Sequence, residues 1–201
     1  MTTIIKRTKK DINRYIIIIS LIFKRPTTDV IETILKEKIS SNAKILELGC
    51  GEGRDAIFLL DKNYDILAVD YSNTVIEKCK ELSNYNDKFK QFDIINDILN
   101  DKFDFIYSIA VIHMFVNKED RNKFYNFIYS HLNKNGIALI VSMDDGIKEY
   151  KSDVTKSFDD VERVVVNNDE KINIATTSCN IANWNTFEQE LLNNDLIVKR
   201  N

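Results

Sequence analysis

The chain has 201 residues, 44% of them hydrophobic, and its 28 basic and 31 acidic residues give a net charge of -3. This length and composition predict one folded domain and exclude a disordered chain, and the balanced charge argues against general affinity for nucleic acid or anionic membranes. The three cysteines lie far apart without a C-x-x-C pair, and there are only two histidines. Neither a disulfide framework nor a metal site is therefore expected, and a reducing, cytoplasmic location is predicted.

Residues 1–41 are expected to form an N-terminal cap segment. Five basic residues lie between positions 6 and 14, and a solvated arm is their simplest interpretation. Residues 15–23, YIIIISLIF, are apolar, but they are far fewer than the ~20 that a membrane span needs. No transmembrane segment is therefore predicted, and this stretch is expected to be a buried helix or strand. Residues 27–39 carry apolar side chains at helical spacing, which predicts a helical segment.

Residues 42–143 alternate between predicted strands and predicted helices. The strands cover residues 44–48, 65–70, 88–92, 103–109 and 137–143, and the helices cover residues 52–60, 73–82 and 118–132. Asn135 and Gly136 are expected to close the last of these helices. Strand and helix in alternation predict an α/β fold with a doubly wound, mostly parallel, Rossmann-like sheet.

Residues 144–182 break this pattern and are expected to form an insert, or lid. Two strands at residues 161–166 and 171–177 flank a polar turn, which predicts a β-hairpin. A last helix, 183–192, and a last strand, 196–199, follow. No linker or repeat marks a second domain, so the whole chain is predicted to form one.

A G-x-G-x-G turn, from Gly49 to Gly53, joins the first predicted core strand to its helix. Glycine lets the backbone approach a ligand closely, since no Cβ stands in the way. The spacing differs from the G-x-G-x-x-G of dinucleotide-binding proteins, and no Gly-Lys-Ser/Thr of a phosphate-binding loop follows. Asp70 ends the second strand, where a carboxylate can accept the hydroxyls of a ribose, and Glu47 adds a carboxylate beneath the turn.

ELGCGEGRD followed by AVDYS resembles the signature of class I S-adenosylmethionine-dependent methyltransferases. GRDAIFLLDKNYDILAVDYS is similar to the tellurite-resistance and thiopurine-type branch, whose enzymes act on small molecules. The resemblance implies the class I methyltransferase fold, with S-adenosylmethionine as cofactor and S-adenosylhomocysteine as product. It also implies a set of cofactor-binding residues: Glu47, Gly49, Cys50, Gly51, Gly53, Arg54, Asp70, Tyr71, Ser72, Asp93, Ile94 and Ser108.

Members of this class usually end in an antiparallel pair, a sixth strand and an inserted seventh. Residues 196–199 fit the sixth strand, and nothing remains for a seventh. Either the chain is truncated, or the hairpin of the insert compensates.

Methyl transfer from a sulfonium is an in-line displacement, so an enzyme mainly positions the reactants and excludes water. The resemblance implies a small-molecule acceptor of thiol, amine or oxyanion type, bound by a monomer or homodimer. The alternatives are a methylase of protein or RNA, and a non-catalytic module that binds S-adenosylmethionine. DNA is not expected, because residues 108–111 read SIAV where methylases of DNA amino groups carry an Asn/Asp-Pro-Pro-aromatic turn. His113 is the candidate general base, with packing in its loop as the other interpretation.

Overall fold

The computed structural model describes residues 3–6, 15–20, 26–142, 146–147, 149–152, 163–167, 170–174, 178–196 and 198–200. Its helices are α1 (Pro26–Lys36), α2 (Arg54–Asp61), α3 (Asn73–Leu82), α4 (Lys118–His131) and α5 (Trp184–Asn193), with short 3-10 turns η1 (Asn86–Lys88) and η2 (Ile112–Met114). Its strands are β1 (Thr3–Lys6), β2 (Tyr15–Ser20), β3 (Lys44–Leu48), β4 (Asp65–Asp70), β5 (Phe89–Gln91), β6 (Phe103–Ile109), β7 (Leu132–Ser142), β8 (Tyr150–Lys151), β9 (Arg163–Asn167), β10 (Glu170–Ile174), β11 (Asn180–Ile181) and β12 (Val198–Arg200).

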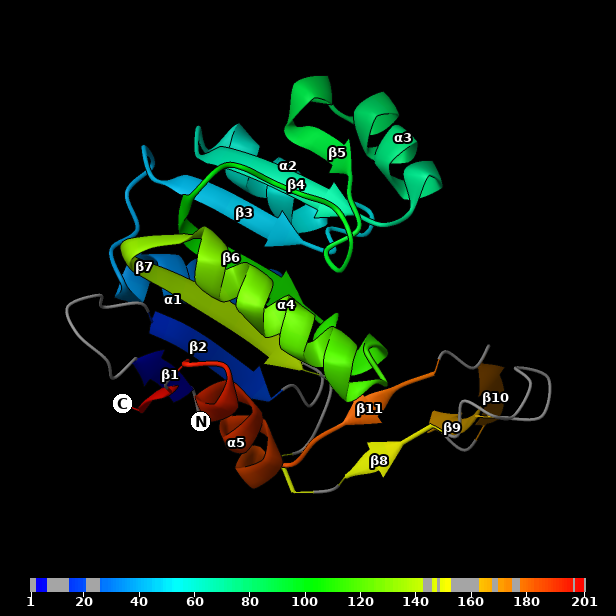
Figure 1. Ribbon diagram of the computed structural model, residues 1–201. Helices are drawn as coiled ribbons and strands as arrows, with labels where there is room; N and C mark the ends of the chain where they lie inside the picture. The colour runs from blue at the N-terminus through cyan, green and yellow to red at the C-terminus, as the bar shows by residue number, and fades with distance from the viewer. Residues whose placement is uncertain are drawn as a thin grey trace.

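One large sheet runs through the centre of the molecule with the strand order β1-β12-β2-β7-β6-β3-β4-β5 (Figure 1). The pairs β4–β5, β3–β4, β3–β6 and β6–β7 are all parallel. The chain moves outward in one direction from β3 to β5 and in the other from β6 to β7. The carboxyl ends of β3 and β6 therefore meet at a switch point, where open α/β sheets bind their ligands. The predicted doubly wound, mostly parallel sheet is confirmed.

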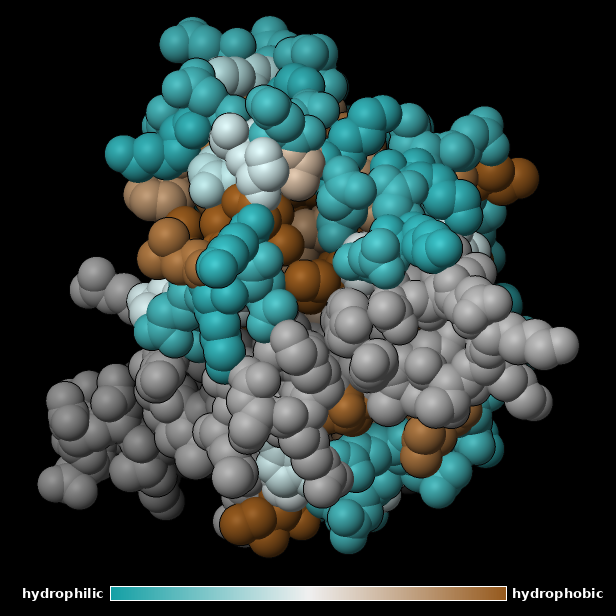
Figure 2. Space-filling model, turned by 90° about the vertical axis from the view of Figure 1, so that its left-hand side faces the viewer, coloured by the Kyte–Doolittle hydropathy of each residue, from teal (hydrophilic) through white to brown (hydrophobic). Residues whose placement is uncertain are grey.

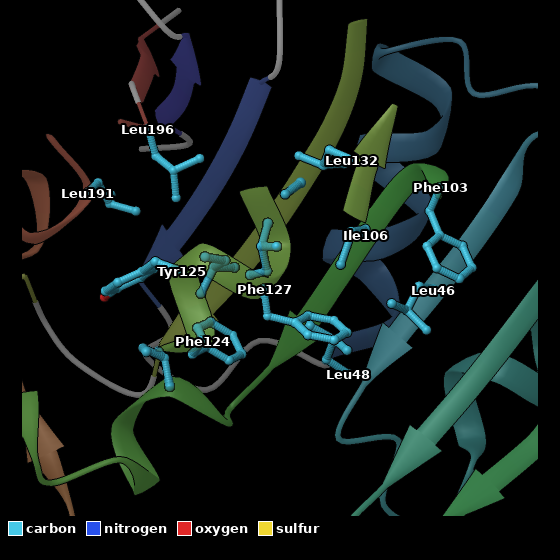
Figure 3. Packing of buried hydrophobic residues seen from close by; sticks show 14 of the residues in the cluster. Leu46, Leu48, Phe103, Ile106, Phe124, Tyr125, Phe127, Leu132, Leu191 and Leu196 are labelled. Atoms are coloured by element: carbon cyan, nitrogen blue, oxygen red, sulfur yellow. The ribbon is translucent and has the colours of Figure 1, made fainter. Parts of the chain in front are cut away.

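Side chains alternate between the two faces of this sheet, as the period of a strand requires. In β3, Ile45 belongs to a buried cluster that includes residues of α1, α2 and α3, whereas Leu46 and Leu48 belong to a cluster that includes residues of α4 and α5. Phe124 and Phe127 of α4 lie over the second face (Figure 3). Each large apolar side chain buried in this way stabilises the fold by about 1.5–3 kcal/mol.

The N-terminal segment contributes strands as well as the predicted helix α1. Strand β2 runs parallel to β7 with a register from Tyr15 opposite Ile137 to Ser20 opposite Ser142. Of the two interpretations of residues 15–23, helix or strand, the structure has a strand over residues 15–20, and residues 21–23 lie outside the described ranges. β1 pairs antiparallel with both β2 and β12. The position beside the fifth core strand, β7, is thus filled from the N-terminal segment.

The boundary between α4 and β7 differs from the prediction. The helix ends at His131 and the strand begins with the next residue, so Asn135 and Gly136 lie inside β7. The prediction that these two residues close the helix is wrong. Lys102 Nζ donates to the Ser130 carbonyl at 2.6 Å, so a side chain satisfies a terminal carbonyl that a glycine cap would otherwise serve. Asn135 has a φ of 67°, the left-handed conformation that asparagine tolerates.

The insert contains the predicted hairpin, formed by β9 and β10 in antiparallel register. Among the described strands, this hairpin pairs only with itself and does not extend the large sheet. A second antiparallel pair, β8 with β11, lies at the base of the insert. The Trp184 N–H, at the start of α5, donates to the Gly146 carbonyl at 3.1 Å, so the last helix is tied to the beginning of the insert.

The edge at which the core strands begin is opposite the switch point. Figure 2 views this edge, and hydrophilic side chains dominate its described surface, with hydrophobic ones between them. Within the described ranges, no helix has the length and apolar character to cross a membrane. The same part of the chain contains no cluster of three or more His, Cys, Asp or Glu side chains that could hold a metal ion.

Candidate functional site

The glycine turn lies at the switch point, between the end of β3 and the start of α2. Gly49 and Gly51 have φ angles of 75° and 52°, a region that side chains other than glycine rarely adopt. The N–H groups of Gly49 and Cys50 donate to the Val69 carbonyl at 2.8 and 3.0 Å, which ties the turn to β4. A Cβ on Gly49 would clash with the Val111 side chain, whereas a Cβ on Gly51 would meet no atom within 4 Å. Gly51 therefore borders open space that a ligand can fill.

Asp70, at the end of β4, fixes this turn through its carboxylate. Its Oδ2 accepts the Gly51 N–H at 3.0 Å, and its Oδ1 accepts the Ser72 N–H at 2.9 Å. A carboxylate has about four lone-pair positions. Asp70 can therefore hold the loop and still accept hydrogen bonds from the hydroxyls of a bound ligand.

The larger of two cavities at this edge has a volume of about 380 Å³ and mostly apolar walls. Asp70 and Asp93 supply its carboxylates. Its lining consists of Gly49, Gly51, Asp70, Tyr71, Phe92, Asp93, Ile94, Ile109, Ala110, Val111, Met114 and Phe115. Both carboxylate oxygens of Asp93 already accept hydrogen bonds, from the Ile95 N–H at 2.9 Å and from Asn96 Nδ2 at 2.7 Å. Asp93 thus shapes the turn beneath this cavity.

The smaller cavity, of about 300 Å³, adjoins the larger one and is strongly charged. The two share Gly49, Gly51, Ile109 and Ala110 as walls. The smaller cavity is lined by these four residues and by Glu47, Cys50, Glu52, Arg54 and Asp55. Glu47 and Asp55 are buried, whereas Arg54 is largely exposed, with its Nε 3.6 Å from Asp55 Oδ1.

Glu47 is the most unusual group in the site. It is only 3% exposed, and its Oε2 has no hydrogen-bond partner among the described residues. Burial raises the pKa of Glu47 well above its usual range, and the negative charge of Asp55 raises it further. The Tyr107 hydroxyl, the Ala56 N–H and Arg54 offset this pKa shift only in part. A buried acceptor without a partner is costly, so the site favours a ligand that brings a positively charged donor to Glu47.

Three residues expected to bind the cofactor make contacts within the scaffold. Gly53 lies against α3, because a Cβ there would stand 2.9 Å from Cys79 Sγ. Ser72 caps α3 by accepting the Val75 N–H at 3.4 Å. Ser108 is buried and donates to the Leu48 carbonyl at 3.1 Å, which joins β6 to β3. None of the three lines either cavity.

Cys50 and His113 have local surroundings that bear on their expected roles. Cys50 lines the smaller cavity, but its N–H is already used by Val69, and burial raises the pKa of its thiol. A thiol held neutral in this way is a weak nucleophile.

His113 is buried on η2, outside the residues that line the two cavities. This placement favours the packing interpretation of His113 over that of a general base.

Several lining residues were not among the predicted site residues. They are Phe92, Ile109, Ala110, Val111, Met114 and Phe115 in the larger cavity, and Glu52 and Asp55 in the smaller one. The apolar members read in sequence as core residues. Ala110 carries one structural signal, a φ of 57°, which is uncommon for a residue with a side chain. This φ angle is known only from the folded backbone and could not have been read from the sequence.

The two cavities together suit a ligand with two chemically different halves. The larger cavity offers apolar walls to a planar base and a carboxylate to a sugar. The smaller one offers carboxylates to an ammonium group and a guanidinium to a carboxylate, which is the pattern of an amino acid. The pair therefore fits a nucleoside joined to an amino acid.

Comparison with a solved structure defines the class of the fold. An S-adenosylmethionine-dependent methyltransferase from Clostridium acetobutylicum superposes with a TM-score of 0.62, at 16% identity, over 87% of this chain and 80% of that chain. The architecture is therefore the class I methyltransferase fold that the glycine turn and Asp70 predicted.

Residues 23–166, more than half of the chain, match the family described as tellurite resistance protein TehB. The chain belongs to the TehB family, which confirms the expected tellurite-resistance branch. A relative from Haemophilus influenzae, the probable S-adenosyl-L-methionine-dependent methyltransferase TehB, is 34% identical over 108 residues, which make up 52% of this chain and 37% of that protein. The histidine protein methyltransferase 1 homolog of Dictyostelium discoideum is 31% identical over 125 residues, 57% of this chain and 40% of that protein. The chain thus spans well under half the length of both relatives.

Proposed function

We propose that this protein transfers a methyl group from S-adenosylmethionine to a small-molecule acceptor. The observation that carries the proposal is the pair of adjoining cavities at the switch point, one apolar beside Asp70 and one charged beside Glu47. S-adenosylmethionine joins a nucleoside and an amino acid through a sulfonium, so its two halves match the two cavities. The name of the Haemophilus influenzae relative supports the same methyl donor.

Each half of the donor has chemically suited partners. Asp70 accepts the ribose hydroxyls with the lone pairs that the loop N–H groups do not use. Glu47 and Asp55 receive the ammonium group of the methionine part, and Arg54 receives its carboxylate. Gly51 leaves the space that a side chain would otherwise take from the ligand.

Bound in this way, S-adenosylmethionine supplies a methyl group on a positively charged sulfur, and its displacement depends on positioning more than on a dedicated base. The chain contributes the walls of the site. Val111, Met114 and Phe115 line the larger cavity on the side of η2, and their apolar surfaces exclude water from the reacting groups.

The acceptor in this proposal is a thiol, an amine or an oxyanion of a small metabolite. The net charge of -3 supports it over RNA, because proteins that bind RNA without specific base contacts use clustered positive charge. A protein substrate is the second candidate, and the name of the Dictyostelium discoideum relative is the observation that favours it.

The test is formation of S-adenosylhomocysteine across a panel of small thiols, amines and oxyanions, with histidine-containing peptides alongside. We expect turnover with at least one small molecule, and a loss of at least about 100-fold in Asp70→Ala, because that variant removes both the ribose acceptor and the anchor of the glycine turn. Asp65→Ala is the matched control. Asp65 lies at the start of the same strand, where its carboxylate forms an ion pair with Lys88 at 3.1 Å, so the turnover rate of this variant should be unchanged.

Turnover of peptides alone would replace the small-molecule proposal by the second candidate. Binding of S-adenosylhomocysteine without turnover of any acceptor would favour a non-catalytic module. Full activity of Asp70→Ala would contradict the assignment of the cofactor site.

A further inference from the structure

A second buried charged group lies outside the two cavities, on α4. Arg121 is only 1% exposed and is the largest fully buried side chain of the described chain. A buried guanidinium persists only when it is paired and hydrogen-bonded. Its partners therefore show which parts of the fold it holds together.

One side of the guanidinium faces α5. Arg121 Nε donates to Glu190 Oε1 at 2.9 Å, and Nη2 donates to Glu190 Oε2 at 2.6 Å. The Tyr125 hydroxyl donates to the same Oε2 at 2.7 Å. Burial alone would lower the pKa of Arg121, but Tyr125 and Glu190 outweigh that effect and raise it. The ion pair is thus two-pronged and joins α4 to the last helix.

The other side of the guanidinium faces η2 and β11. Arg121 Nη1 donates to the Ile112 carbonyl in η2 at 2.8 Å and to the Asn180 carbonyl in β11 at 3.4 Å. The neighbours of Ile112 in the chain include Val111 and Met114, which line the larger cavity. One side chain therefore connects a wall of that cavity, the base of the insert and the last helix.

We propose that Arg121 is a positioning residue for the cofactor site. By holding the Ile112 carbonyl, it fixes the turn at residues 111–115 in the position that closes the larger cavity, and Glu190 in turn holds the guanidinium. The inference rests on the proposed binding of S-adenosylmethionine but not on the identity of the acceptor. If Arg121 acts in this way, the insert and α5 support the cofactor site through it, although neither supplies a residue that lines the two cavities.

The walls at residues 111–115 belong to the larger cavity only. Loosening this turn should therefore weaken binding of the nucleoside half of a ligand and leave the contribution of the amino-acid half unchanged. The probes are S-adenosylhomocysteine and methylthioadenosine, which lacks the amino-acid half, and the measurement is their dissociation constants by calorimetry at a temperature where every variant is folded.

We expect Glu190→Gln and Arg121→Lys each to bind both probes about tenfold more weakly than the wild type. The matched control is Asn194→Ala. Asn194 Nδ2 also joins α5 to α4, through Asn122 Oδ1 at 3.0 Å. Its only hydrogen bond to Glu190 among the described residues is to the backbone carbonyl, at 2.8 Å, and not to the carboxylate that holds Arg121. Its loss should lower the melting temperature and leave both dissociation constants within about twofold of the wild type.

A lower melting temperature with unchanged dissociation constants in Glu190→Gln would overturn the proposal, because Arg121 would then serve stability alone. Weaker binding of S-adenosylhomocysteine with unchanged binding of methylthioadenosine would overturn it as well. If Arg121→Lys does not fold, Glu190→Gln and the milder Tyr125→Phe decide, with a smaller loss of affinity expected for the second. Failure of the wild type to bind either probe would instead refute the cofactor site itself.

Discussion

Glu47 illustrates at the scale of one residue how the fold changes the ionisation of a buried carboxylate. The side chain comes from the second-last position of β3 and points to the face covered by α2, where Asp55 is also buried. Burial and the charge of Asp55 together raise the pKa of Glu47. A group whose pKa is raised on folding stabilises the fold below its ordinary pKa, and that contribution is lost as pH rises through the raised value.

The affinity for a ligand should depend on pH in the opposite direction from this stability, because an ammonium group binds the ionised carboxylate. We expect the affinity for S-adenosylhomocysteine to increase with pH across the range from the ordinary carboxyl pKa up to the raised pKa of Glu47, by at most about tenfold per pH unit. Calorimetry in buffers of different ionisation enthalpy should detect release of a proton on binding. In Glu47→Gln, which keeps the shape but cannot ionise, the pH dependence should vanish. A wild-type affinity independent of pH would remove Glu47 from the ammonium site.

The sequence predicted those cavity-lining residues whose position depends on local geometry. The spacing of Gly49, Gly51 and Asp70 follows from one strand-turn-helix-strand unit, so a motif of 22 residues in the printed sequence contains them all. The resemblance implied that Ser108, near the end of the fourth core strand, binds the cofactor, but its hydroxyl donates to a carbonyl of the neighbouring strand. This hydrogen bond depends on which strands pair, and no local sequence pattern predicts that pairing.

At the scale of elements, the composition of residues 15–20 did not predict that they form the strand β2 and pair with β7. An apolar stretch fits a helix or a strand equally, and only its pairing with β7 decides between them. That pairing has five matched positions and covers one edge of a central strand of the sheet. Without β2, the backbone groups of β7 on that side would be unpaired and would offer an edge for aggregation.

Deleting residues 1–20 should therefore destabilise the whole fold. With a net contribution of roughly 1 kcal/mol for each backbone hydrogen bond lost, we expect the free energy of unfolding to fall by about 3 kcal/mol or more. Urea unfolding measures this change. Deletion of residues 1–10, which removes β1 but leaves β2, is the matched control and should cost less. An unchanged urea midpoint after the longer deletion would contradict the role of β2 in the sheet.

At the scale of the whole molecule, the position of the proposed donor site was predictable and the acceptor was not. The two cavities lie at the ends of β3, β4 and β6, whose alternation with helices is regular and can be read along the chain. The insert is polar and lacks a period. Its Asn180 carbonyl accepts a hydrogen bond from Arg121, 59 residues away, and Arg121 also binds Glu190 of α5, 69 residues away. Contacts of this range carry no local signal, so the sequence predicted that residues 144–182 form an insert but not how they attach.

The same long-range contacts predict how the molecule unfolds. Trp184 is the only tryptophan, and it lies in α5, outside the residues that line the cofactor cavities. If residues 1–201 form one domain, its fluorescence and the far-ultraviolet circular dichroism should follow one coincident transition in urea. S-adenosylhomocysteine at 100 times its dissociation constant should raise the free energy of unfolding by about 2.7 kcal/mol. The rise should be equal for both signals, because the ligand stabilises a unit that includes α5. Two separate transitions, or a shift of the dichroism without the fluorescence, would show that the C-terminal part unfolds independently and would refute the single domain.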